Sequence, residues 1–177
     1  MKIYTRKGDD GTTGLLYGGR VRKDSELPSA YGDVDEAQAF LGLARAESGD
    51  AELGDLLVSI ERDLYVLMAE LATAPANRSK LTPGQSLVTP AMVEALEPII
   101  DDLSSRFEPP TEFVIPGGTR VSALLDVART VVRRAERMAI GAAIDGSFVV
   151  PYLNRLSDLL WTMARWQEGN SLIAKEA

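Results

Sequence analysis

Residues 128 to 140, ARTVVRRAERMAI, constrain the fold most strongly, because their charged and apolar side chains separate at helical spacing. At about 100° per residue, the charged side chains fall on one arc of a helix. This charged strip consists of Arg129, Arg133, Glu136 and Arg137, with Asp126 beside it. The opposite face is apolar and consists of Leu124, Val127, Ala128, Val131, Val132, Ala135 and Met138. The sequence therefore predicts an amphipathic helix that buries one face against other elements.

The charged strip has two interpretations. Guanidinium groups stay ionised and offer paired donors that match phosphate oxygens, so three arginines on one strip favour a polyphosphate ligand. Glu136 would then accept a hydrogen bond from a hydroxyl or an amine, or bind a hydrated metal ion. The alternative is a solvated face whose charges pair with one another at i,i+3 and i,i+4 spacing.

Four further segments have helical periodicity, and none alternates as a strand of a large sheet would. The expected helices span residues 29 to 47, 51 to 73, 92 to 103 and 152 to 167. Asp33 is expected to cap or begin the first of them. Residues 73 to 90 are expected to form an exposed connection, and residues 107 to 118 an extended break. The predicted fold class is all-α, a five-helix antiparallel bundle with a glycine-rich N-terminal loop.

Composition narrows the chemistry further. A length of 177 residues, 45% of them apolar and 25% charged, suits a single domain over residues 1 to 177. The net charge of −7 disfavours general binding to nucleic acid or to an anionic membrane, so any anion site must be local. Without a signal region or cysteine, the cytoplasm is the default location. The absence of His and Cys leaves no imidazole base, thiol nucleophile or usual zinc site. An enzyme of this composition relies on positioning and electrostatics.

Residues 3 to 19, IYTRKGDDGTTGLLYGG, cannot form a regular helix, because five glycines interrupt them. Glycines let backbone N–H groups approach an anion closely. Hydroxyls and positive charges in or near this segment come from Thr5, Thr12, Thr13, Arg6, Lys7 and Lys23. The residue orders of the Walker A loop and of the dinucleotide fingerprint are absent. The segment is interpreted either as a triphosphate-binding loop or as an ordinary N-terminal tail.

Three more residues have both a functional and a structural interpretation. Asp35 lies in the early turns of its helix, where the helix dipole favours negative charge whether or not a cation binds. Asn154 lies off the apolar stripe of the last helix, where it would read a nucleotide or serve as a first-turn cap. Phe113 precedes the turn at residues 116 to 118, where an aromatic side chain usually belongs to the core.

Five blocks of the sequence resemble the PduO-type ATP:cob(I)alamin adenosyltransferases in the order of that family. The blocks are YTRKGDDGTTGL, AYGDVDEAQAFLG, FVIPGG, ARTVVRRAER and YLNRLSDLLW, and the resemblance spans residues 3 to about 166. It implies homotrimers with an active site at each subunit interface. It also implies that cob(I)alamin attacks the ribose 5′ carbon of ATP, giving adenosylcobalamin and triphosphate.

The resemblance also implies roles for individual residues. The ATP loop, residues 1 to 25, would bind through Thr5, Arg6, Lys7, Gly8, Asp9, Gly11, Thr13, Gly14 and Lys23. The rest of the nucleotide site would consist of Arg133, Arg134, Ala135, Glu136, Arg137 and Asn154. Mg²⁺ would be bound mainly by the ATP phosphates, with Glu136 nearby.

On the corrinoid side, the resemblance implies that Asp35 pairs with Arg129 of the neighbouring subunit. Phe113 would displace the lower axial ligand and leave four-coordinate Co(II), which is easier to reduce. Two blocks depart from the family pattern. The usual DELN reads Asp35-Glu36-Ala37-Gln38 here, and Asp126 stands where a histidine is often found. A reductase and an adenosylcobalamin-dependent acceptor enzyme are candidate partners.

Two other classes of protein remain as alternatives. A non-catalytic carrier would bind a corrinoid or a nucleotide and deliver it to a partner enzyme, leaving ATP whole. A purely structural helical oligomer would bind no nucleotide, and ATP would not change its melting temperature.

Overall fold

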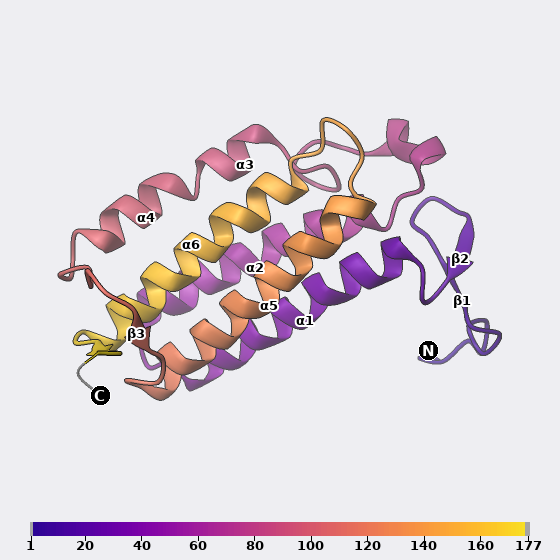
Figure 1. The fold of residues 1–177 in the computed structure, drawn as a ribbon. Coiled ribbons are helices and arrows are strands. Elements are labelled where there is room, and N and C mark those ends of the chain that lie inside the picture. The colour runs from indigo at the N-terminus through magenta and orange to yellow at the C-terminus, as the bar shows by residue number, and fades with distance from the viewer. Residues whose placement is uncertain (1, 176–177) are drawn as a thin grey trace.

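Four long helices lie side by side (Figure 1). They are α1 (Glu26–Glu47), α2 (Ala51–Leu71), α5 (Arg120–Ala142) and α6 (Val149–Glu168). Helices α2 and α5 run in the direction opposite to α1 and α6 (Figure 1). The computed structural model describes residues 2 to 175. Helix α1 packs against α2 and α5, and α5 packs against α6. None of the helices in the described part of the chain is long and apolar enough to cross a membrane.

The core contains the leucine and alanine stripes that the periodicity predicts. Leu41, Leu57, Leu125 and Leu160 are fully buried, one from each long helix. The apolar face expected for residues 124 to 138 is narrower than predicted, because Val127 is 40% exposed and Met138 is 38% exposed. Both lie at the edges of the α5 face that packs against α1 and α6.

The number of helices differs from the expected five. The described residues contain six α-helices and one 3₁₀-helix, because the segment at 92 to 103 is split into α3 (Pro90–Glu94) and α4 (Glu97–Ser104). Pro98 has no N–H to continue the hydrogen-bond ladder of α3, and it lies instead in the first turn of α4, where a proline is tolerated.

The segment from residue 73 to residue 90 is not a uniformly exposed connection. It contains the 3₁₀-helix η1 (Pro75–Lys80), and the side chains of Ser86 and Val88 are buried. The carboxylate of Glu70, which is 2% exposed, accepts hydrogen bonds from the Val88 backbone N–H at 2.7 Å and from Arg78 at 2.9 Å. A buried carboxylate requires such partners, so the segment folds back onto α2.

Two small antiparallel ribbons add to the helices, where the sequence indicated only loops. β1 (Thr12–Gly14) pairs with β2 (Arg20–Arg22) in the N-terminal segment. β3 (Val114–Ile115) pairs with β4 (Leu172–Ile173), which joins the segment before α5 to the segment after α6. Alternation is too weak a signal in strands of two or three residues.

Three helices, α1, α3 and α6, begin earlier than expected. Ser25 precedes the first residue of α1, so Asp33 lies inside the helix and is not a cap. α6 begins at Val149, because Pro151 is tolerated in a first turn. Asn154 therefore lies beyond the first turn, and the interpretation of its side chain as a cap is wrong.

Candidate functional site

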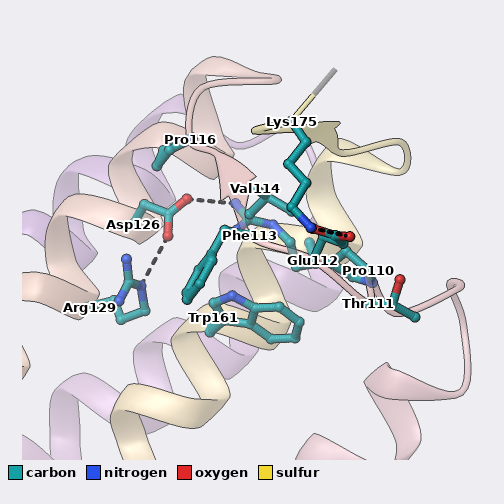
Figure 2. A pocket seen from close by; sticks show the side chains of 11 residues that line it. Pro110, Thr111, Glu112, Phe113, Val114, Pro116, Asp126, Arg129, Trp161 and Lys175 are labelled. Atoms are coloured by element: carbon teal, nitrogen blue, oxygen red, sulfur yellow. Dashed lines mark hydrogen bonds and ion pairs between the residues drawn. The ribbon is translucent and has the colours of Figure 1, made fainter. Parts of the chain in front are cut away.

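A cavity of about 870 Å³ opens at the end of the bundle where α5 begins and α6 ends. It is lined by the segment before α5, by α5 and α6 themselves and by the C-terminal segment. The lining residues are Pro110, Thr111, Glu112, Phe113, Val114, Pro116, Asp126, Arg129, Trp161, Arg165 and Lys175 (Figure 2). Aromatic rings, proline rings and charged groups thus share one concave surface.

Phe113 is 91% exposed and lies immediately before β3. Its interpretation as a core residue is therefore wrong for the isolated subunit. The backbone carbonyl of Phe113 accepts a hydrogen bond from the N–H of Ala174 at 2.8 Å, next to the β3–β4 pairing. The ribbon fixes the backbone of Phe113 and leaves its ring facing the cavity (Figure 2).

Asp126 lies in the wall of this cavity and not on the solvated strip, since it is only 4% exposed. One carboxylate oxygen accepts a hydrogen bond from Arg129 Nε at 3.0 Å, and the other accepts one from Arg165 Nη2 at 2.6 Å. Arg165 is 1% exposed, and its guanidinium lies 5.8 Å from the centre of the Trp161 ring. A buried carboxylate and a buried guanidinium thus neutralise each other between α5 and α6.

The charged strip continues along α5 beyond the cavity. Arg133 and Arg137 are exposed, and among the described residues neither pairs with a carboxylate. Arg137 Nη1 donates to the backbone carbonyl of Arg133 at 3.0 Å. Asn154 Nδ2 donates to Glu136 Oε1 at 2.9 Å, so α6 contributes an amide to the strip, as expected. These two guanidinium groups are available to an anion.

Two residues of the expected nucleotide site face elsewhere. Arg134 points to α1, where Nε donates to Asp33 at 3.2 Å and Nη2 donates to Glu36. The side chain of Ala135 is fully buried in the core, so only its backbone could contribute to a site. Within one subunit, Arg134 is therefore already neutralised by two carboxylates.

The N-terminal segment forms the β1–β2 ribbon and a preceding loop that exposes its functional groups. Thr5, Arg6, Lys7, Asp9, Gly11, Gly14 and Lys23 are exposed, whereas Gly8 and Thr13 are half-buried. Arg20, which the sequence analysis did not single out, holds this loop together by donating to Thr12 Oγ1 at 2.6 Å and to the Lys7 carbonyl. A side chain on Gly8 would place its Cβ 3.0 Å from Lys23 Nζ, so glycine permits this close approach. Arg6 has a φ of 60°, a backbone conformation that costs free energy for a residue with a side chain.

The N-terminal ribbon and the cavity lie at opposite ends of the subunit (Figure 1). The ribbon is anchored at the C-terminal end of α2, where Leu16 N–H donates to the Ala72 carbonyl at 2.8 Å. The 23 residues of α5 span the bundle, a length of about 35 Å. One subunit therefore does not bring the N-terminal loop to the cavity that Phe113 faces.

Asp35 is exposed on α1, and within the described residues it has no ion-pair partner. Arg129 pairs with Asp126 of its own subunit. The expected contact between Asp35 and Arg129 of a neighbouring subunit requires a second chain and stays a prediction.

The sequence pattern of the cobalamin adenosyltransferase family matches residues 3–167. The chain belongs to this family. The corrinoid adenosyltransferase of Mycobacterium tuberculosis is 44% identical over 170 residues, which cover 93% of this chain and 87% of that protein. The corrinoid adenosyltransferase of Citrobacter freundii is 42% identical over 172 residues, which cover 94% and 95%.

Solved structures agree with this assignment to the family. A variant of the PduO-type ATP:corrinoid adenosyltransferase from Lactobacillus reuteri, complexed with cobalamin and ATP, has a TM-score of 0.89 to this chain. The two chains are 28% identical, and the match covers 98% of this chain and 99% of the other.

This family member places more residues at its cavity than the sequence analysis named. Trp161, Arg165 and Lys175 line the cavity, but none was singled out beforehand. The sequence contained one indication of Arg165, because it is the only charged residue in the run LLWTMARW, where no solvated strip is expected. The sequence contained no indication of Lys175, because its position at the cavity depends on the pairing of β4 with β3.

Proposed function

We propose that the chain transfers the 5′-deoxyadenosyl group of ATP to the cobalt of cob(I)alamin, giving adenosylcobalamin and triphosphate. Membership of the family supports this function, as does the relation between Phe113 and its cavity. A 91% exposed phenylalanine on a wall of an 870 Å³ cavity costs hydration free energy unless a large apolar ligand covers it. The corrinoid macrocycle is such a ligand.

The corrinoid supplies the nucleophile, because cobalt(I) itself attacks the ribose 5′ carbon. The protein therefore needs no general base, which suits a chain without His and Cys. Its own tasks are to bind both substrates, to align them and to keep water from the cavity. Phe113 would act as a wedge against the lower face of the cobalt and displace the axial ligand there.

ATP would bind through the N-terminal loop and the α5 strip. Backbone N–H groups and the side chains of Arg6, Lys7 and Lys23 would bind the triphosphate, while Arg133 and Arg137 would neutralise the charge that develops on the leaving group. Asn154 would hold Glu136 in place beside the nucleotide.

Mg²⁺ would be bound mostly by phosphate oxygens. Among residues 2 to 175, no group of three or more acidic side chains could hold a metal ion. Glu136 uses Oε1 to accept from Asn154, and Oε2 is available to a hydrated cation. This single carboxylate fits a metal that is held mainly by its substrate, where Mg²⁺ keeps several of its waters.

A homotrimer with interfacial sites would bring together the two binding regions that lie apart within one subunit. The N-terminal loop and the cavity are separated by the length of α5 within one subunit. A neighbouring chain could place its N-terminal loop beside this α5 strip, and its Asp35 beside Arg129. A reductase would then deliver an electron to the bound corrinoid, and an adenosylcobalamin-dependent enzyme would accept the product.

The decisive experiment is the absorbance change of cobalamin in the presence of ATP, Mg²⁺ and a chemical reductant, with triphosphate measured in parallel. We expect the spectrum of adenosylcobalamin to appear together with one triphosphate per corrinoid. A protein that binds cobalamin but leaves ATP whole would be a carrier, and the proposed activity would be wrong.

A further inference from the structure

Four charged side chains form a row of alternating sign from the cavity to the C-terminal end of α6. Arg129 donates to Asp126, Asp126 accepts from Arg165, and Arg165 Nε lies 2.7 Å from Glu168 Oε1. The side chains of Arg165 and Glu168 are each 1% exposed, and that of Asp126 is 5% exposed. Water has little access to Asp126, Arg165 and Glu168, so these three groups must satisfy one another.

Glu168, at the inner end of the row, contacts the segments that flank the β3–β4 ribbon. A Cβ on Gly118, at the end of the turn after β3, would lie 3.0 Å from Glu168 Oε2, so this turn packs directly on the carboxylate. Ser171, the residue before β4, donates its hydroxyl to Glu168 Oε1 at 2.6 Å. Glu168 therefore contacts the chain after β3 and the chain before β4.

The outer end of the row is Arg129, whose side chain is 25% exposed and lines the cavity. Asp126 and Arg129 face the same cavity as Phe113 (Figure 2). The guanidinium of Arg129 keeps one fixed partner inside its own subunit, and its other donors remain available.

We propose that Asp126 is a positioning residue for the corrinoid half of the reaction: it orients Arg129 directly and, through Arg165 and Glu168, the ribbon that presents Phe113. This inference rests on the proposed adenosyl transfer. Asp126 itself does not reach the reacting atoms. Its carboxylate provides the negative charge that fixes two guanidinium groups on opposite sides of it.

The proposal makes a specific kinetic prediction for Asp126→Asn. The amide keeps the shape of the carboxylate but presents an N–H₂ group to one of the two guanidinium groups, so one contact becomes donor against donor. Because the misplaced groups face the corrinoid, we expect kcat/KM for cob(I)alamin to fall, on the order of 100-fold at most. KM for ATP should stay within about twofold, since the change leaves Arg133, Arg137 and the N-terminal loop intact.

Asp63→Asn is the matched control. Asp63 is a half-buried carboxylate that, like Asp126, joins two helices, since it accepts from the Tyr152 hydroxyl at 2.8 Å between α2 and α6. It does not line the cavity. This substitution should leave the kinetic constants for both substrates unchanged.

Glu168→Gln provides a second test if Asp126→Asn assembles poorly. It changes the inner end of the row and should also lower kcat/KM for cob(I)alamin without raising KM for ATP. Because both carboxylates act through Arg165, the double variant should lose less than the product of the two single losses.

The outcomes separate the two levels of the hypothesis. Equal rises of KM for ATP and cob(I)alamin in Asp126→Asn, or losses that are matched by Asp63→Asn, would overturn the positioning role. Unchanged corrinoid kinetics in both row variants would do the same. A wild-type protein that produces no adenosylcobalamin would instead overturn the proposed function, and the positioning role with it.

Discussion

Asn154 Nδ2 donates to Glu136 Oε1 at 2.9 Å and thereby joins α6 to the charged strip of α5. Asn154 lies in the second turn of its helix and is exposed, so the hydrogen bond serves neither helix capping nor the core. The contact fixes a carboxylate beside two guanidinium groups that have no carboxylate partner in the described part of the chain.

Asn154→Ala should weaken the use of ATP and leave the fold intact. Without the amide, Glu136 is no longer held beside the nucleotide, and we expect KM for ATP to rise by roughly tenfold at most. The measurement is initial-rate kinetics at saturating cob(I)alamin, with sedimentation to confirm the oligomeric state. If KM for ATP is unchanged while the melting temperature falls, Asn154 is structural.

Arg133→Lys should impair catalysis although the charge is kept, because lysine loses the planar pair of donors that matches a phosphate. The loss of one hydrogen bond to a charged group, about 1.5–3 kcal/mol, predicts a decrease of roughly 10- to 100-fold in kcat/KM for ATP. Arg120→Lys, at the exposed start of the same helix, is the control and should be neutral. Normal turnover by a destabilised Arg133→Lys protein would exclude the role in phosphate binding.

Asp35 and Arg129 should be coupled across the subunit boundary of the proposed trimer. Removing one partner of a fully desolvated pair costs roughly 3–5 kcal/mol, and much less if water reaches it. A charge exchange is unsuitable here, because Arg129→Asp would place a second carboxylate against Asp126. The test is instead the cycle of Asp35→Ala, Arg129→Ala and the double variant, with trimer content and turnover measured for each. Strictly additive losses in both measurements would mean that the two residues do not meet.

Asp63 should make stability depend on pH in the direction opposite to a typical surface carboxylate. Burial raises the pKa of Asp63 above its usual value near 3.8, while the hydrogen bond from Tyr152 opposes this increase. With a folded-state pKa above the unfolded one, the contribution of Asp63 to stability is fully present below about pH 3.8 and is lost as pH rises through the raised pKa. Asp63→Asn keeps an acceptor for Tyr152 and removes the titration.

The prediction for Asp63 is checked by thermal unfolding of both proteins between about pH 3 and pH 8. The melting temperature of the variant should rise relative to that of the wild type as pH increases through this window. A constant difference between the two curves would mean that Asp63 does not titrate abnormally.

The sequence alone determined the helical class and the positions of the helices that form the bundle core. Hydrophobic periodicity is a local property: the spacing alone places Leu53, Leu57 and Leu64 on one face of α2, and all three are buried. The same local rule located the strip of Arg133 and Arg137, which needs only helical spacing. Periodicity could not locate the break before α4 or the start of α6. Pro98 and Pro151 lie within the first turns of these helices, where proline is tolerated, so a proline alone does not mark the first residue of a helix.

The tertiary structure alone decided which charges are free and which are neutralised. Asp126, Arg129, Arg133 and Arg134 all lie on α5, yet Asp126 is buried against Arg165, Arg134 pairs with α1, and Arg133 is left exposed. Charge pairing acts through space and depends on burial, so residues 39 positions apart, such as Asp126 and Arg165, determine each other's role. Periodicity within one helix contains no information about the helix that packs against it.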